Sequence, residues 1–207
     1  MTDPDLKAAY ALASPDDSRR LYAGWAETYD RSFAEATGYR LPEEVASAFA
    51  GAGGQGPVLD LGAGTGLCGA ALARLGIGPL DATDLSPEML RVAAAKGIYR
   101  SCFAGDMLAR LPVADGAYAG VTCAGTFTTG HVGPEALDEV IRTMAPGALA
   151  VLSIKATHWD VAGFGAGFSR LSDRITGLHS LERRIFAPGS AGEHADDLSR
   201  LAVFRRA

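Results

Sequence analysis

The 207-residue sequence lacks the features that mark disulfide-rich, metal-binding and membrane-spanning proteins. Its three cysteines, Cys68, Cys102 and Cys123, are widely separated and form no metal-binding or redox pair, so we expect reduced core thiols and no metal site. No apolar run approaches the ~20 residues that a membrane span needs. The first residues also lack the basic and then apolar order of a signal peptide, and a cytoplasmic location is therefore expected.

Clustered positive charge is absent as well. The formal net charge is −5 and the pI is near 5.3, whereas nucleic-acid binding depends on clustered basic residues. We therefore expect a small-molecule or protein substrate and no nucleic-acid partner, while the sequence does not indicate an oligomeric state. With 48% hydrophobic residues, the chain is long enough for one well-packed domain and short for two, so a single domain over 1–207 is predicted.

What the sequence does contain is a glycine-rich stretch at 58–66, Val-Leu-Asp-Leu-Gly-Ala-Gly-Thr-Gly. A short continuous apolar run is typical of a buried parallel strand. Glycine tolerates the positive φ and the close ligand approach that a strand-to-helix loop requires. The stretch therefore predicts a nucleotide-type cofactor at the end of a strand.

From Pro57 onward, apolar runs alternate with helical stretches, which predicts a parallel sheet covered by helices on both faces. Capping and stop signals place helices over 86–97 and from 133 to about 145. The five strands expected in this core, which extends over 57–155, are 58–61, 80–83, 100–104, 120–123 and 148–155.

The two ends of the chain complete the predicted fold. Helices over 14–25 and 42–50 predict an N-terminal helical cap within 1–50, separated from the core by a glycine-rich connector. In 156–207 we expect a helix over 161–175, followed by strands near 181–186 and 198–204. The predicted fold class is α/β, with a Rossmann-like, seven-stranded, mostly parallel sheet and a C-terminal antiparallel hairpin.

Three acids follow successive strands. Asp60 closes the first strand, Asp84 follows 24 residues later at the end of the second, and Asp106 follows after a further 22. Each spacing fits one strand-helix unit, and ligands of open parallel sheets bind at the carboxyl ends of the strands. The three carboxylates are therefore expected to surround one ligand.

The glycines allow two interpretations. Gly64-x-Gly66-x-x-Gly69 satisfies the dinucleotide-binding pattern, with Asp84 twenty residues after Gly64, which would suit an NAD(P)-dependent oxidoreductase. That pattern should begin directly at the strand end, and here it begins four residues past Asp60. It also leaves Asp106 without a role, so the oxidoreductase is the alternative and not the first hypothesis.

The form Asp-x-Gly-x-Gly-x-Gly at 60–66, with its matched acids, resembles class I S-adenosylmethionine-dependent methyltransferases, and the resemblance covers nearly the whole chain. Residues 25–30, Trp-Ala-Glu-Thr-Tyr-Asp, resemble the segment before the domain in many small-molecule members. The stretch 125–147, with Thr-Thr-Gly-His at 128–131, is similar to the methyltransferase-like proteins of the Williams-Beuren region. One position differs from the family pattern: the chain has Ala148 where family members commonly have a second glycine after Pro-Gly.

The resemblance implies S-adenosyl-L-methionine as the cofactor and S-adenosyl-L-homocysteine as its product. The residues that it assigns to the cofactor are Tyr29, Asp60, Gly62, Ala63, Gly64, Gly66, Asp84, Leu85, Met89, Asp106, Met107 and Cys123. Asp60 and the backbone of 62–66 would hold the methionyl part, with amide groups at the helix N-terminus facing its carboxylate. Asp84 would accept both ribose hydroxyls.

The remaining assignments concern the adenine and the methyl group of the cofactor. Leu85 and Met89 would flank the adenine, Asp106 would accept from its exocyclic amine, and the Met107 amide would face the ring. Tyr29 would close the pocket from the N-terminal side. Cys123 and Ala124 would lie beside the methyl-bearing sulfur.

Four residues are candidates for acceptor binding: Tyr22, Trp25, His131 and His158. Tyr22, Trp25 and Tyr29 are spaced three and four residues apart, so a simple packing face of a helix is the alternative, above all for Tyr22 and Trp25. His131 follows the fourth strand and is a weak candidate for a general base. A protein that binds the cofactor without catalysis is a further alternative, and the sequence does not identify the acceptor.

Overall fold

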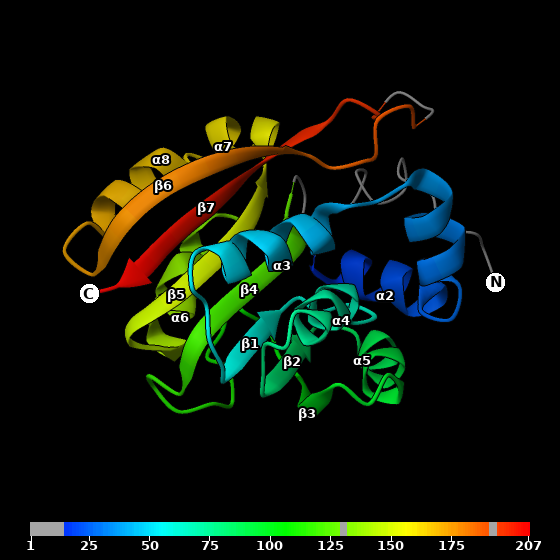
Figure 1. Cartoon of the computed structure of the whole chain (residues 1–207), viewed down its shortest axis with the longest axis horizontal. Coiled ribbons are helices and arrows are strands. Elements are labelled where there is room, and N and C mark those ends of the chain that lie inside the picture. The colour runs from blue at the N-terminus through cyan, green and yellow to red at the C-terminus, as the bar shows by residue number, and fades with distance from the viewer. Residues whose placement is uncertain (1–14, 129–131, 191–193) are drawn as a thin grey trace.

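The computed structural model describes residues 15–128, 132–190 and 194–207, and seven strands of this part form one sheet in the order β3-β2-β1-β4-β5-β7-β6 (Figure 1). The strands are β1 (Val58–Leu61), β2 (Leu80–Asp84), β3 (Tyr99–Ala104), β4 (Tyr118–Phe127), β5 (Met144–Lys155), β6 (Ile175–Arg184) and β7 (Leu198–Arg206). The first five are parallel, and β7 runs antiparallel to both β5 and β6. The predicted fold class, with its C-terminal antiparallel pair, is confirmed.

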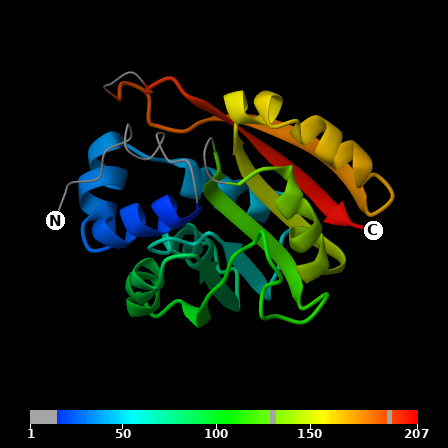
Figure 2. The ribbon, with the colours of Figure 1, turned by 180° about the vertical axis from the view of Figure 1, so that it is seen from behind.

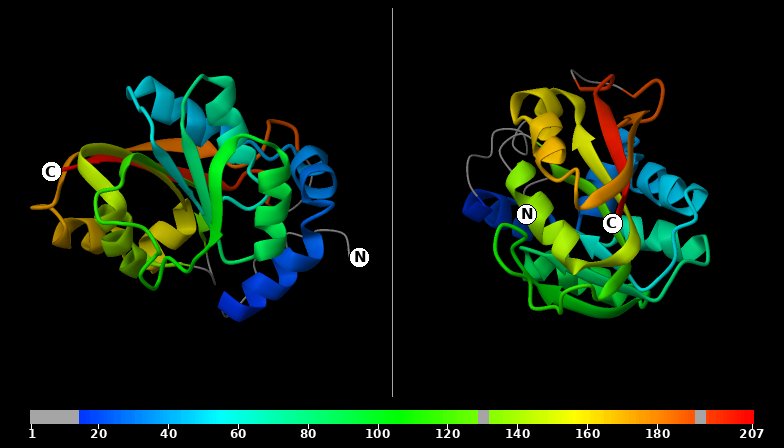
Figure 3. Two further views of the ribbon diagram at one scale, coloured as in Figure 1. Left: turned by 90° about the horizontal axis from the view of Figure 1, so that it is seen from below. Right: turned by 90° about the vertical axis from the view of Figure 1, so that its left-hand side faces the viewer.

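Helices cover both faces of the sheet. The described helices are α2 (Pro15–Trp25), the π-helix η1 (Tyr29–Glu35), α3 (Leu41–Gly51), α4 (Leu67–Arg74), α5 (Pro87–Ala95), the 3₁₀-helix η2 (Pro134–Ala136), α6 (Leu137–Thr143), α7 (Ala156–Val161) and α8 (Phe164–Arg170). Figure 3 shows α3 and α4 on one side of the sheet and α6 with α8 on the other, and α6 and α8 face the viewer in Figure 2. No helix in the described part is both long and apolar enough to cross a membrane.

The alternation of strand residues divides the core between these two helical layers. In β1, Val58 packs with the side chains of α3 and α4, while Leu59 and Leu61 pack with those of α6 and α8. All four residues of this strand are buried, as expected for a parallel strand covered on both faces. Asp60 therefore lies on the same face as Val58, beneath α4.

The start of α5 shows why this helix begins where the sequence predicts. The Ser86 hydroxyl accepts a hydrogen bond from the Met89 amide at 3.2 Å, and Pro87 occupies the first helical turn, where its missing N–H costs nothing. Because Asp84 ends β2 only two residues earlier, this cap fixes α5 directly beside the carboxyl end of the sheet.

The N-terminal segment is arranged differently from a simple cap. α2 packs on α5, where the buried Trp25 contacts Met89, and η1 follows it. α3, which was predicted as part of the cap, packs on the sheet through Val45 and Phe49. In the described part of this segment, α2 and η1 lie over the carboxyl ends of the strands, and α3 reaches the pocket there through Pro42.

The C-terminal third departs from the sequence prediction. The helix predicted over 161–175 is wrong, because two helices, α7 and α8, are separated at Gly163, whose φ of +77° is a conformation that favours glycine. The following strand, predicted near 181–186, already begins at Ile175 and ends at Arg184. β4 is longer than expected at both ends, and β5 is longer at its amino end.

Candidate cofactor site

A pocket of about 1050 Å³, its open mouth included, lies at the carboxyl ends of β1, β2 and β4. Its walls come from the loop after β1, the β2 end with the start of α5, the loop after β3, the end of β4, and the segments α2 to α3. The lining residues from these segments are Arg19, Tyr22, Tyr29, Tyr39, Pro42, Gly62, Ala63, Gly64, Thr65, Leu67, Cys68, Asp84, Leu85, Ser86, Met89, Asp106, Met107, Leu108, Ala124, Gly125, Thr126 and Val132.

The glycine loop needs its glycines for different reasons. Gly62, Gly64 and Gly66 all have positive φ, at +62°, +55° and +88°. A Cβ on Gly62 would overlap the Thr126 hydroxyl, whereas a Cβ on Gly64 would meet nothing within 4 Å. Since Gly64 also lines the pocket, its backbone faces space that a ligand can occupy at close range.

Gly69 has a packing role that bears on the dinucleotide alternative. A Cβ on Gly69 would overlap the Tyr99 hydroxyl, because α4 packs closely over that ring. Gly69 does not line the pocket. The third glycine of the dinucleotide pattern is thus explained by contact between α4 and Tyr99, without a pyrophosphate.

Asp84 ties the glycine loop to the start of α5. Its Oδ2 accepts a hydrogen bond from the Gly64 amide at 2.8 Å, and its Oδ1 accepts one from the Ser86 amide at 2.9 Å. Burial raises the pKa of Asp84, and these amide hydrogen bonds oppose that rise. The carboxylate lines the pocket, so it is placed to accept further donors from a ligand.

Asp60 lies beneath the loop and not in the pocket wall. Its side chain is fully buried and accepts hydrogen bonds from the Gly69 amide at 3.1 Å, the Tyr99 hydroxyl at 2.8 Å and the Thr122 hydroxyl at 3.0 Å. Burial raises its pKa to about 6. These contacts join β1 to α4, β3 and β4, and Asp60 is not among the residues that line the pocket.

An aromatic wall closes the N-terminal side of the pocket. The ring of Tyr29 stacks on Phe33 with centroids 4.9 Å apart and meets Tyr22 edge-on at 6.2 Å. Phe33 in turn contacts Tyr39 at 5.5 Å. Burial raises the pKa of Tyr22 and Tyr29, so both hydroxyls are protonated at neutral pH and can donate hydrogen bonds.

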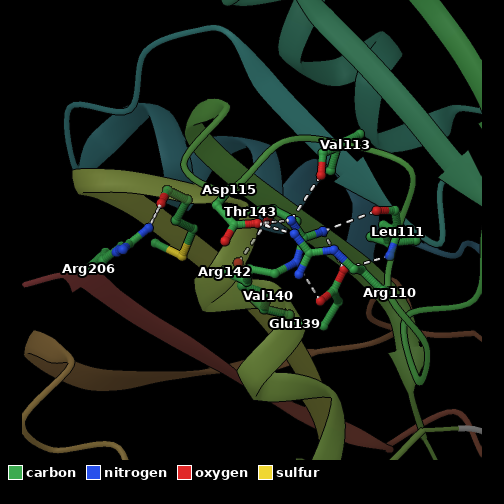
Figure 4. Close-up of polar contacts among 10 residues, drawn as sticks. Arg110, Leu111, Val113, Asp115, Glu139, Val140, Arg142, Thr143 and Arg206 are labelled. Atoms are coloured by element: carbon green, nitrogen blue, oxygen red, sulfur yellow. Dashed lines mark hydrogen bonds and ion pairs between the residues drawn. The ribbon is translucent and has the colours of Figure 1, made fainter.

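A charged cluster holds the loop that contributes Asp106 and its neighbours to the pocket (Figure 4). The Arg142 guanidinium donates to the carbonyl groups of Leu111 and Val113 at 3.2 and 2.9 Å and to the Glu139 carboxylate at 2.6 and 2.7 Å. Glu139 Oε1 also accepts from the Leu111 amide at 2.7 Å. This arrangement fixes the loop between β3 and β4 against α6.

The comparisons with known proteins agree with this geometry. Residues 58–147 match a family described as a methyltransferase domain. The human Methyltransferase-like protein 27 is 30% identical over 157 residues, which cover 72% of this chain and 62% of that protein. The chain thus spans about 62% of the length of the curated relative that it matches.

Two solved structures have the same fold. A TehB-like SAM-dependent methyltransferase from Corynebacterium glutamicum superposes with a TM-score of 0.62 at 20% identity, covering 91% of this chain and 100% of that one. N-methyltransferase NodS from Bradyrhizobium japonicum, in complex with S-adenosyl-L-homocysteine, superposes with a TM-score of 0.65 at 17% identity, covering 89% and 96%. Residues 58–147 thus match the methyltransferase domain family, and the chain has the fold of class I methyltransferases. The resemblance expected from the sequence is confirmed, and the oxidoreductase alternative is set aside.

Most residues predicted for the methyltransferase site lie together in the pocket. The predicted residues that line it are Tyr22, Tyr29, Gly62, Ala63, Gly64, Asp84, Leu85, Met89, Asp106 and Met107. Ala124, expected beside the sulfur, lines it too. Their contacts with cofactor or acceptor stay a prediction.

Other predicted residues lie elsewhere. Gly66 is buried against Tyr99, and Cys123 is fully buried in the sheet. Trp25 is 2% exposed and packs edge-on to Tyr22 at 5.5 Å, which agrees with the packing alternative. His158 Nε2 lies 2.9 Å from the Val132 carbonyl oxygen, outside the pocket wall. His131 falls outside the described residues.

Several lining residues were missed. Gly125 and Thr126 continue β4, so the rule that ligands bind at the carboxyl ends of strands could have found them. Arg19 and Tyr39 carry no such signal, because tertiary packing brings them to the pocket; Tyr39 is held by its bridge to Phe186. Among the described residues, no group of three or more His, Cys, Asp or Glu side chains could hold a metal ion.

Proposed function

We propose that this methyltransferase transfers a methyl group from S-adenosyl-L-methionine to a small-molecule acceptor. The observation that carries the proposal is Asp84, whose carboxylate holds Gly64 and the start of α5 while facing the pocket. The open space beside Gly64 fits a ligand that approaches the backbone closely. The S-adenosyl-L-homocysteine bound to NodS supports the same type of cofactor.

The proposed cofactor placement follows the order of the strands. Asp84 would accept the ribose hydroxyls, with Leu85 and Met89 beside the adenine and Asp106 and the Met107 amide at its edge. The amides of 62–65 and the Tyr29 hydroxyl would hold the methionyl part. Asp60 would act indirectly, because its contacts with Gly69 and Thr122 fix the loop from below.

The acceptor would enter at the β4 end of the pocket. Ala124, Gly125 and Thr126 line that end, and Tyr39 and Val132 lie with them. The charged residues among the described lining residues are Arg19, Asp84 and Asp106, which belong to α2, β2 and the loop after β3. The described residues at this end carry small, aliphatic and hydroxyl-bearing side chains, which supports a small acceptor without a strong charge beside its nucleophile.

The protein's part in the reaction would be alignment and exclusion of water. S-adenosyl-L-methionine supplies an activated methyl group that passes in line to the acceptor nucleophile, leaving S-adenosyl-L-homocysteine. Alignment at near-attack distance can contribute about 7 to 11 kcal/mol. The aromatic wall of Tyr22 and Tyr29 would exclude water. His131 stays our weak candidate for a general base, and a cytoplasmic location without a nucleic-acid partner is part of the proposal.

Titration calorimetry tests the proposal. S-adenosyl-L-methionine and S-adenosyl-L-homocysteine should bind, and NADH should not. Asp84→Ala should weaken binding by about 1.5 to 3 kcal/mol, the value of hydrogen bonds to a charged group, which raises Kd about 10- to 150-fold. Asp173→Ala is the control, since this carboxylate is exposed and outside the pocket.

The outcomes are distinct. Unchanged affinity in Asp84→Ala would sink the ribose assignment, and tight binding of NADH would contradict the cofactor. A panel of small acceptors with labelled donor then separates an enzyme from a silent cofactor-binding protein, because only the enzyme accumulates S-adenosyl-L-homocysteine.

A further inference from the structure

Asp30 joins the N-terminal cap to the glycine loop. It lies in the first turn of η1, directly after the pocket residue Tyr29. Its Oδ1 accepts a hydrogen bond from the Thr65 hydroxyl at 2.5 Å, and its Oδ2 accepts one from Lys96 Nζ at 2.7 Å. Lys96 Nζ also donates to the Thr65 carbonyl oxygen at 2.6 Å. Asp30, Thr65 and Lys96 thus form a closed triangle, here named the cap–loop latch.

The surroundings strengthen this triangle. Thr65 is 1% exposed, and the side chains of Asp30 and Lys96 are 32% and 25% exposed, so solvent screens their attraction less than that of a surface pair. Lys96 is the C-cap residue of α5, where the helix dipole favours a cation. η1 is a π-helix, a form that is rare and frequent at functional sites.

The latch connects two opposite walls of the pocket. Thr65 lines the pocket from the glycine loop, and Tyr29 lines it from the cap. Separation of the cap from the loop would widen the pocket between these walls and ease the exit of a molecule held there. Separation breaks the contacts of Asp30 with Thr65 and Lys96.

A second ion pair provides an internal comparison. Arg91 and Glu27 also join α5 to the cap segment, through a contact between Arg91 Nη2 and Glu27 Oε1. Their side chains are 66% and 56% exposed, and neither residue lines the pocket. This pair therefore shares the charge and the partner elements of the latch without its contact to the glycine loop.

We propose that Asp30 and Lys96 are positioning residues, which act through Thr65 and Tyr29 to hold the cap and the glycine loop closed and thereby set the rate of cofactor release. The identity of the released molecule rests on the proposed function. Closure of the latch is a property of the protein alone.

The first test measures dissociation of S-adenosyl-L-homocysteine by stopped-flow displacement. Lys96→Met should speed dissociation about tenfold, which corresponds to the loss of one hydrogen bond between charged groups, and should leave association within about twofold of the wild type. Lys96→Arg, which keeps the charge and the donors, should restore slow release. Arg91→Met, the matched control, should behave as the wild type.

The second test needs no ligand. In hydrogen–deuterium exchange of the free protein, Lys96→Met should raise exchange in 29–35 and 62–66 together, while the strands of the core keep their protection. Arg91→Met should change neither segment. If Lys96→Met does not fold, Asp30→Asn takes its place, because it removes the charge and keeps an oxygen for Thr65.

The two tests keep the proposals apart. The latch is overturned if Lys96→Met leaves both exchange and release unchanged, or if Arg91→Met has the same effects. A wild-type protein that does not bind S-adenosyl-L-homocysteine overturns the proposed function, and the exchange experiment still decides on the latch.

Discussion

The buried carboxyl of Asp60 makes stability depend on pH in a predictable direction. Burial raises its pKa from 3.8 to about 6, although Tyr99, Thr122 and Gly69 donate hydrogen bonds to it. The folded state therefore holds this proton more tightly than the unfolded chain. Its contribution to stability is complete below about pH 3.8 and is lost as the pH rises through about 6. The difference between the two pKa values corresponds to about 3 kcal/mol.

Asp60→Asn should abolish this dependence. The side-chain oxygen of asparagine can still accept from the Gly69 amide and Tyr99, and the Thr122 hydroxyl can turn to accept from the new amide group. Between about pH 4 and about pH 7, we expect the free energy of unfolding of the variant to gain about 2 to 3 kcal/mol relative to the wild type. Other titrating groups are common to both proteins and cancel in the difference.

Urea unfolding followed by circular dichroism measures this difference at a series of pH values. Asp173→Asn, which changes an exposed carboxylate, is the control and should differ from the wild type by a nearly constant amount. Parallel curves for Asp60→Asn and the wild type would refute the reasoning, because they would mean that Asp60 titrates alike in both states.

Two further predictions concern packing around the site. Gly64→Ala should cost about 1 to 2 kcal/mol of stability, because alanine is strained at the positive φ of this position. Gly62→Ala should cost more, because its Cβ would also overlap Thr126. Equal losses of the two variants in urea unfolding would contradict this prediction. Arg142→Met should lower the free energy of unfolding by about 3 kcal/mol, because it removes the cation that pairs with the buried Glu139 and the donor to the carbonyl groups of Leu111 and Val113. Arg110→Met, at a 67% exposed side chain, should cost under about 0.5 kcal/mol. Equal losses of unfolding free energy in the two arginine variants would show that the buried contacts of Arg142 do not contribute to stability.

The core of the fold was predictable because local signals and tertiary structure agree there. Val58 to Leu61 is buried on both faces and reads as an unbroken apolar strand apart from Asp60. Ser86 and Pro87 mark the start of α5 through capping chemistry that is local in sequence. The fold class and the positions of these elements follow from such signals.

The last third gave no comparable signal. β6 is an edge strand that pairs with β7 alone, and most of its residues are exposed. A strand that buries neither face firmly shows no alternation, so its start at Ile175 cannot be read from the pattern. Likewise, Gly163 within an apolar stretch does not reveal by itself that the helix is interrupted there.

The site was predictable where residues follow strand ends and not where they come from distant segments. Asp84 and Asp106 were found because each follows a strand. Tyr39 reaches the pocket because it pairs with Phe186, nearly 150 residues away in the sequence, and no local pattern contains that contact. Asp30 and Lys96 are likewise brought together only by the packing of the cap on α5.

The different positions of Asp60 and Asp84 have a common geometric cause. Asp84 is the last residue of β2, so its carboxylate leaves the sheet at the carboxyl edge and faces the pocket. Asp60 lies inside β1, where it is followed by Leu61. The alternation of side chains along the strand directs Asp60 toward the face covered by α4. An acid inside a doubly covered strand is buried and needs donors, which Gly69, Tyr99 and Thr122 supply. Position relative to the strand end therefore distinguishes the carboxylate that supports the loop from the carboxylate that a ligand can reach.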